Sequence, residues 1–160
     1  MVVYTDSDWA GDKNNRRSVS GYVILLLGVP ILWKSKLQRS VSLSSSEAEY
    51  YALSEAAKEI KFIVMILKAL EVEIEMPITL KVDNVGAIFL PENGSANSCT
   101  KHVDTRYYFI CEFVEDGVIK IVFVRTHENK ADIFTKNVSS EVYNSHVNEF
   151  VEDRKNVEPG

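Results

Sequence analysis

The stretch LSSSEAEYYALSEAAKEIKFIVMIL, residues 43–67, contains the longest helical pattern of the chain. Ser44, followed three residues later by Glu47, forms the capping box that marks a helix start. Apolar residues then recur at steps of three and four, as on one buried helix face. The members of this face are Ala52, Leu53, Ala56, Ile60, Ile63, Val64 and Leu67. We therefore predict a long helix that begins after Ser44 and packs on a sheet.

Three predicted strands precede this helix. Val2–Thr5 is a short β-branched and aromatic run that ends at Asp6. Ser18–Leu27 and Val29–Trp33 also have strand composition, and a glycine and a proline mark the turn between them. The opening of the chain is therefore expected to form an antiparallel meander.

After the long helix the chain alternates between strand and helix. The predicted elements are a strand over Ile78–Val82, a short helix over Val85–Leu90, a polar loop over residues 91–100, a helix over His102–Val114, a strand over Val118–Val124 and a last helix from about Lys130 toward Phe150. This mixed order indicates one α/β domain over residues 1–152 with helices packed on a sheet. Residues 153–160 are expected to be a frayed tail.

Charge is unevenly distributed along the 160 residues. The net charge of −5 argues against a nucleic-acid binder, yet residues 13–46 contain basic and no acidic side chains. The basic members are Lys13, Arg16, Arg17, Lys34, Lys36 and Arg39. A local basic stretch can hold phosphates on an otherwise acidic protein. The alternative is a solvated pair of strands with a chance charge bias.

Four acidic residues occupy positions that surface decoration explains poorly. Asp6 ends the first strand, Glu49 continues the apolar face of the long helix, Asp83 ends the fourth strand, and Asp132 opens the last predicted helix. A carboxylate that faces a sheet is costly unless it is compensated, and hard cations such as Mg²⁺ are the usual compensation. Two such ions about 4 Å apart form a phosphoryl-transfer site.

Each of these acids also has a structural explanation. Asp6 would cap a turn together with Asp8, and Glu49 would complete a second capping box with Ser46. Asp83 before an asparagine is ordinary turn chemistry, and Asp132 suits a helix N-terminus. Composition alone does not bring the four together in space.

Six segments in register connect these positions. YTDSDWAGD, RRSVSGYV, LSSSEAEYYAL, VDNVGAI, TKHVDTRYYFI and ADIFTK follow one another between about residues 4 and 137. In sequence and order they resemble the ribonuclease H domain of copia-type LTR retrotransposon polyproteins. This resemblance implies a ribonuclease H-like α/β fold, with a five-stranded mixed sheet and helices on both faces.

The resemblance also implies a catalytic quartet that binds two Mg²⁺ ions, for which Mn²⁺ can substitute. Asp6 matches the aspartate that bridges both metals, Glu49 the helix glutamate of the second metal, Asp83 the fourth-strand aspartate, and Asp132 the last acid, on the first metal. Asp8 and Glu47 are the competing assignments. We favour Asp6 as the strand acid, and Glu49 because the capping box already uses Glu47.

Further candidate residues are assigned with less support. The candidate substrate contacts are Arg16, Arg17, Lys36, Arg39, Lys101 and Arg106. His127 precedes the last acid and is a candidate for assisting product release, although its spacing to Asp132 is short. His102 lies in the TKHVD segment without a chemical account, and His146 is expected on the surface.

The function implied by the resemblance is an endoribonuclease that cleaves the RNA strand of RNA–DNA hybrids and leaves 3′-hydroxyl and 5′-phosphate ends. The expected partners are the hybrid and a reverse transcriptase domain that precedes this one, with no membrane. The chain opens without a signal peptide, so we expect a cytoplasmic (virus-like particle) or nuclear location. The alternative is a decayed or domesticated module that binds nucleic acid or protein. Another nuclease of the same superfold, such as an integrase, fits the order of the acids less well.

Overall fold

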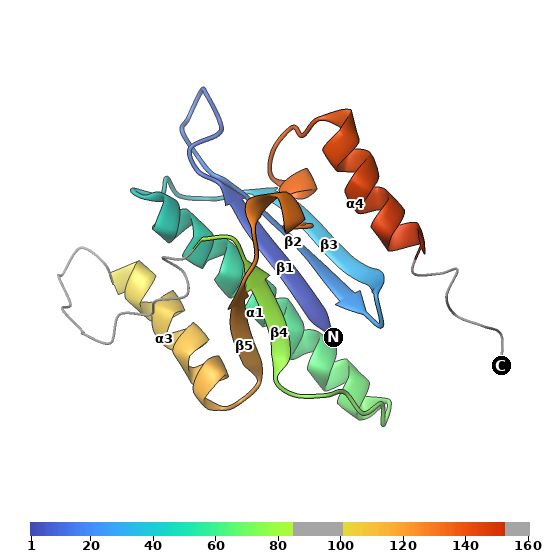
Figure 1. Cartoon of the computed structure of the whole chain (residues 1–160). Coiled ribbons are helices and arrows are strands. Elements are labelled where there is room, and N and C mark those ends of the chain that lie inside the picture. Colours follow the sequence, from blue (N-terminus) through green and yellow to red (C-terminus); the bar gives the residue numbers. More distant parts are fainter. Residues whose placement is uncertain (85–100, 153–160) are drawn as a thin grey trace.

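The structure is a computed structural model that describes residues 1–84 and 101–152. Its centre is a five-stranded sheet in the order β3-β2-β1-β4-β5 (Figure 1). The strands are β1 (Val2–Asp8), β2 (Val19–Leu26), β3 (Val29–Leu37), β4 (Ile78–Val82) and β5 (Ile119–Phe123). The first three are antiparallel neighbours, whereas β4 runs parallel to both β1 and β5. The predicted mixed sheet is therefore confirmed.

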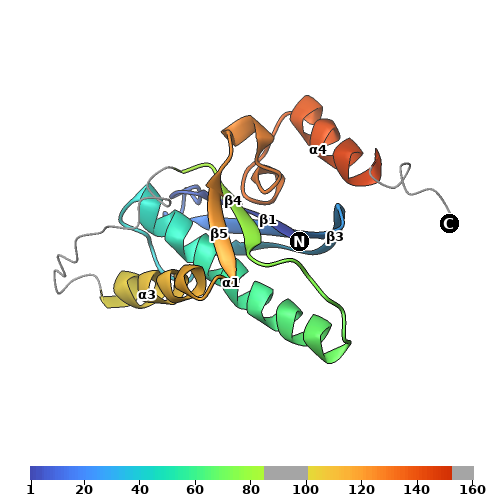
Figure 2. The same ribbon diagram turned by 60° about the horizontal axis from the view of Figure 1, so that its bottom comes forward.

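Helices cover both faces of this sheet (Figure 2). The helix α1 (Ser45–Ala69) and the helix α3 (Lys101–Glu115) lie on one face. The other face carries the helix α4 (Ser140–Glu152) and two short 3-10 turns, η1 (Thr126–Glu128) and η2 (Asp132–Phe134). The expected architecture, with helices on both faces, is confirmed.

Alternate residues of the central strands supply two cores. Val3 and Ile24 belong to the larger one, which they share with the buried face of α1. Tyr4 and Val23, one position along, pack on the opposite face with Ala131. This alternation is what a sheet covered on both faces requires. The predicted apolar face of α1 is buried at every position named above.

The turn between β2 and β3 consists of two residues. Leu27 and Gly28 both have positive φ, 52° and 81°, as in the type I′ turns that match the twist of a hairpin. Pro30 lies in β3, an edge strand, where a missing N–H is tolerated. The strand also extends past its predicted end at Trp33, because pairing with β2 continues as far as Leu37.

The prediction of a last helix from Lys130 was wrong. The chain instead forms η2 and reaches α4 only at Ser140. At the start of α4 the backbone N–H of Val142 donates to the Ser139 hydroxyl oxygen at 3.3 Å. Two local side-chain hydrogen bonds explain this. The N–H of Ala131 donates to the Asn129 side chain, and the Thr135 hydroxyl donates to the backbone oxygen of Asp132, so residues 129–135 fold into tight turns. His146 on α4 was expected at the surface, but it is buried with 3% of its area exposed.

Three predictions fall outside the described residues: the helix over 85–90, the loop over 91–100 and the tail over 153–160. Across residues 1–84 and 101–152, no helix combines the length and the apolar character needed to cross a bilayer.

Candidate metal centre

Two adjacent parallel strands bring the first two acids together. In the register between β1 and β4, Tyr4 lies opposite Lys81. Two residues beyond this pair, each strand leads to an acid: Asp6 lies within β1, and Asp83 directly follows β4. Because parallel strands end at the same edge of a sheet, these carboxylates meet at the edge where open α/β sheets commonly place their sites.

A buried asparagine fastens the segment that carries the third acid. The Asn129 side chain donates to the backbone oxygen of Thr5 at 3.0 Å and accepts from the N–H of Ala131 at 3.1 Å. Asn129 is fully buried. These two bonds tie the segment before η2 to β1, so that Asp132 lies beside the end of that strand.

Thr135 and Gly21 bring the other side of η2 onto the sheet. The Thr135 hydroxyl donates to the carboxylate of Asp6 and also lies 3.1 Å from the backbone oxygen of Asp132. Gly21 is the β2 residue opposite Asp6. A Cβ at Gly21 would lie 2.6 Å from the Thr135 methyl carbon and 2.9 Å from the Cβ of Phe134. Only glycine therefore lets this turn approach the strand closely enough to position both acids.

Asp6, Asp83 and Asp132 form what we call the aspartate triad. Each offers one carboxylate oxygen, and these oxygens lie within 4.8 Å of one another. Asp6 and Asp132 are buried, with 3% and 5% of their area exposed. The predicted convergence of the four acids is thus reproduced for three of them.

Glu49 lies beside the triad rather than within it. It is in the second turn of α1, and 6% of its area is exposed. Its Oε1 accepts from the backbone N–H of Ser7 at 3.2 Å, while Oε2 is buried and has no hydrogen-bond partner among the described residues. We call the triad and Glu49 together the carboxylate cluster.

Burial and mutual repulsion raise several pKa values in this cluster. The pKa of Glu49 rises to about 9, chiefly through desolvation and then through the charges of Asp6 and Asp83. Desolvation raises the pKa of Asp132 to about 6, although the nearby Lys136 opposes this shift. The pKa of Asp83 is raised by desolvation and by Asp6, against a hydrogen bond from Thr126. The cluster is therefore electrostatically unfavourable without a compensating cation.

The donor set fits a hard divalent cation. All of its ligand atoms are carboxylate oxygens, which suit Mg²⁺ or Mn²⁺ rather than softer metals. The unpartnered Oε2 of Glu49 is the type of buried polar atom that needs an explanation, and a nearby cation would supply one. The residues present thus fit the metal centre that the sequence predicted.

The competing acids lie elsewhere. Asp8 is not part of the triad and lines a neighbouring groove with Gly11 and Lys136. Glu47 accepts from the backbone N–H of Leu43 at 2.6 Å, while the Ser44 hydroxyl accepts from the N–H of Glu47 at 3.1 Å. The predicted helix start is confirmed, with the Glu47 bond reaching one residue before the cap.

The basic candidates come from several elements of the fold. Arg16 and Arg17 lie in the turn between β1 and β2, whereas Lys36 on β3 and Arg39 just beyond it are exposed. Arg106 on α3 stacks over the ring of Tyr51 at 4.2 Å. The side chains of Lys101 and His102 lie outside the described residues.

The position of His127 gives no support for a catalytic role. It is in η1, its side chain is 69% exposed, and its ring lies 3.9 Å from the carboxylate of Glu128.

Sequence reasoning missed four residues that shape the site. Gly21, Thr135 and Lys136 all lie inside the quoted segments, but their residue types alone indicate no role in the site. Asn129 lies just before ADIFTK, and no sequence motif marks it as part of the site. The spacing of Lys136, one helical turn after Asp132, was the available sign of a contact between the two side chains.

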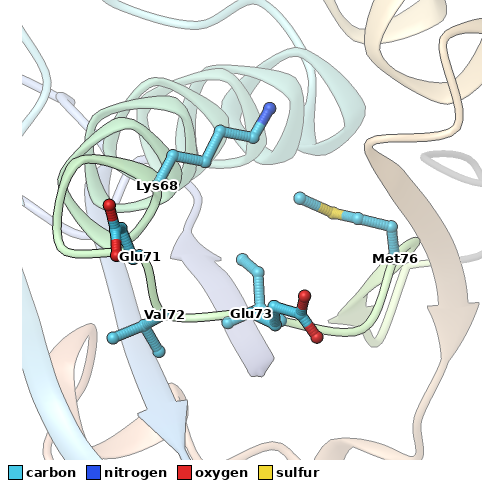
Figure 3. A pocket seen from close by; sticks show the side chains of 6 residues that line it. Lys68, Glu71, Val72, Glu73 and Met76 are labelled. Carbon is cyan, nitrogen blue, oxygen red and sulfur yellow. The ribbon is translucent and has the colours of Figure 1, made fainter.

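A second pocket lies at the far end of α1 (Figure 3). Its lining consists of Lys68, Glu71, Val72, Glu73, Ile74 and Met76. At 1.5 Å per residue, Lys68 is about 28 Å along the helix from Glu49. This pocket is therefore separate from the carboxylate cluster.

Comparisons of sequence relate the chain to retrotransposon polyproteins. It is 39% identical over 139 residues to the retrovirus-related Pol polyprotein from transposon RE1 of Arabidopsis thaliana, covering 87% of this chain and 10% of that protein. It is 42% identical over 133 residues to the corresponding polyprotein from transposon TNT 1-94 of Nicotiana tabacum, covering 83% and 10%. The chain thus spans about a tenth of the length of these curated relatives. No family model matches it.

Comparison of structures supports the fold independently. The crystal structure of LC11-RNase H1 in complex with RNA/DNA hybrid superposes with a TM-score of 0.59 at 16% identity, covering 84% of this chain and 92% of that one. RNase H1 from Halobacterium salinarum gives a TM-score of 0.54 at 16% identity, over 95% and 97% of the two chains. The chain therefore has the ribonuclease H fold.

The raised pKa of Glu49 should make the stability of the metal-free protein depend on pH. Between its ordinary pKa of 4.5 and the folded value of about 9, the folded protein holds a proton that the unfolded chain releases. Raising the pH in this window should therefore lower the free energy of unfolding of the metal-free protein. Glu49→Gln should flatten this dependence and raise the free energy of unfolding at pH 8, measured by urea unfolding in EDTA.

Glu47→Gln is the matched control, because it removes the same charge two residues away. It weakens the cap of α1 and should lower stability instead. A Glu49→Gln protein that is less stable than wild type at pH 8 would contradict the electrostatic account.

Proposed function

Because this chain is a ribonuclease H domain of the copia-type retrotransposon polyprotein family, we propose that it cleaves the RNA strand of RNA–DNA hybrids by a two-metal-ion mechanism. The observation that supports this most is the carboxylate cluster at the edge where β1 and β4 end. It joins three buried or half-buried aspartates with a buried glutamate from α1. A purely structural role does not account for so many adjacent carboxylates, because each raises the cost of ionising the next.

The residues of the cluster have distinct tasks in this proposal. Asp6 is held by the Thr135 hydroxyl and lies close enough to Asp83 and Asp132 to share a cation with them. Glu49 comes from α1, and its unpartnered Oε2 would help to hold the second ion. When bound, two Mg²⁺ ions supply an activated water for in-line attack and stabilise charge on the leaving 3′ oxygen. The products would then have 3′-hydroxyl and 5′-phosphate ends.

The proposed substrate is an RNA–DNA hybrid. A solved structure with the same fold, LC11-RNase H1, was determined in complex with one. The exposed Lys36 and Arg39 lie on and just after β3, in the meander that includes the strand of Asp6. They can therefore contact phosphates of a duplex docked at the cluster, while the 2′-hydroxyls distinguish RNA from DNA.

The wider context of the chain is also a proposal. The part of the chain that matches the Pol polyproteins covers about 10% of their length, and we propose that a reverse transcriptase domain precedes this one and presents the hybrid to it. A non-catalytic binding module is the second candidate, and a cleavage assay distinguishes it from the nuclease.

The proposed nuclease activity requires a divalent metal ion and the aspartate triad. The chain should cut a labelled hybrid in Mg²⁺ or Mn²⁺, but not in EDTA, and leave 3′-hydroxyl and 5′-phosphate ends. Asp6→Asn and Asp83→Asn should each reduce the rate by more than the 10–100-fold typical of an outer-shell partner of a metal ligand. Because each removes repulsion, both variants should melt at or above the wild-type temperature without metal. Asp8→Asn, which alters an acid outside the triad, should retain activity.

Two results would contradict the proposed nuclease function. Wild-type protein that binds hybrid and Mg²⁺ without cutting would favour the binding module. Clear destabilisation by Asp83→Asn would favour the turn-capping explanation of that acid.

The basic stretch over residues 13–46 is expected to bind phosphates of the hybrid. Replacing Lys36 and Arg39 together with alanine should weaken hybrid binding and reduce the slope of log affinity against log salt by up to about 1.8, because two phosphate contacts are lost. The measurement is a salt titration in Ca²⁺, which blocks cleavage, with duplex DNA as the competitor. The control is Lys61 and Lys68 to alanine, two exposed lysines on α1. Equal slopes for both double variants would show that the stretch is only a solvated surface.

A further inference from the structure

We propose that Lys136 is a tethered cation that occupies the aspartate triad in the metal-free protein, and that a divalent ion must displace it to bind there. Its Nζ lies 3.0 Å from Oδ1 of Asp132 and 3.9 Å from Oδ2 of Asp6. The inference rests on the metal centre of the proposed function and concerns how that centre is loaded.

Local backbone geometry aims this side chain at the triad. The backbone N–H of Lys136 donates to the backbone oxygen of Asp132 at 3.2 Å, which closes one turn of helix. Residues four apart on such a turn lie on the same side, so the lysine side chain runs back alongside the acid. Its neighbour Thr135 binds Asp6 at the same time. The turn thus presents both a fixing hydroxyl and a positive charge to the same carboxylates.

The Lys136 ammonium and a divalent ion compete for the position beside Asp6 and Asp132. Both would lie against the carboxylates of Asp6 and Asp132, and like charges about 4 Å apart repel each other even at the effective dielectric of a protein surface. The ammonium is a compact point charge on a flexible stem with no fixed bidentate geometry. It neutralises the triad without being locked into it.

The structure also provides a place for the displaced side chain. The Lys136 side chain is 37% exposed, so it can move without disturbing the core. It lines a groove of about 440 Å³ next to the triad, together with Asp8 and Asp12. These two carboxylates lie outside the triad and can pair with the ammonium after it withdraws. The two aspartates of YTDSDWAGD that lie outside the triad, Asp8 and Asp12, thereby acquire a role that the metal centre itself does not give them.

Calorimetric titration of Mg²⁺ into the metal-free full chain tests the proposal. Lys136→Met keeps the length of the side chain and removes its charge, so it should bind Mg²⁺ roughly tenfold more tightly than wild type. Without metal, the same variant should melt at a lower temperature than wild type, because the triad loses its counter-charge. Lys136→Arg keeps the charge and should resemble wild type. Lys58→Met, which breaks an exposed pair with Glu55, should leave the Mg²⁺ affinity unchanged.

The ¹⁵N NMR signal of the Lys136 ammonium reports directly whether Mg²⁺ displaces this side chain from the triad. It should shift on addition of Mg²⁺ in wild type, with the same midpoint as the calorimetric titration. Equal or weaker Mg²⁺ binding by Lys136→Met, or an ammonium signal that does not respond, would overturn the inference while leaving the nuclease proposal intact. Failure of every variant to bind Mg²⁺ would overturn the metal centre, and this inference with it.

Discussion

The close approach of residues 129–136 to strands β1 and β2 is the contact on which the site depends. Asn129 bonds to the backbone of β1, Thr135 bonds to Asp6, and Gly21 leaves the space between them. The sheet can bring Asp6 and Asp83 together by register alone, but Asp132 arrives only through this contact. The third acid is thus positioned by hydrogen bonds to a strand rather than by a helix.

The site opposes the stability of the protein that contains it. Desolvation and repulsion raise the pKa values of Glu49, Asp83 and Asp132, so without metal the fold disfavours the charged forms of these three carboxyls. Lys136 offsets part of this cost. Functional sites commonly retain such unfavourable arrangements, and the surrounding core must supply the difference. Here that core is the apolar face of α1 packed against the sheet.

The sequence predicted the sheet, α1 and the acids because each has a local signal: alternation in the strands, the capping box of Ser44 and Glu47, and segments in register around the quartet. It did not predict the turns of η2, since the pattern from Lys130 to Phe150 favours a helix and the bonds that override it join Asn129 and Thr135 to a strand far away in the chain. The burial of His146 and the contact of Lys136 also depend on that tertiary arrangement. Long-range hydrogen bonds leave no periodicity to detect.

The central claim is that the carboxylate cluster is a binding site for two divalent ions. Anomalous diffraction from crystals of the chain soaked in Mn²⁺ tests it most directly. The account predicts one peak at coordination distance from all three aspartates of the triad and a second peak in contact with both Asp6 and Glu49. No anomalous density at the cluster under saturating Mn²⁺, with Lys136 still paired to Asp132, would contradict it.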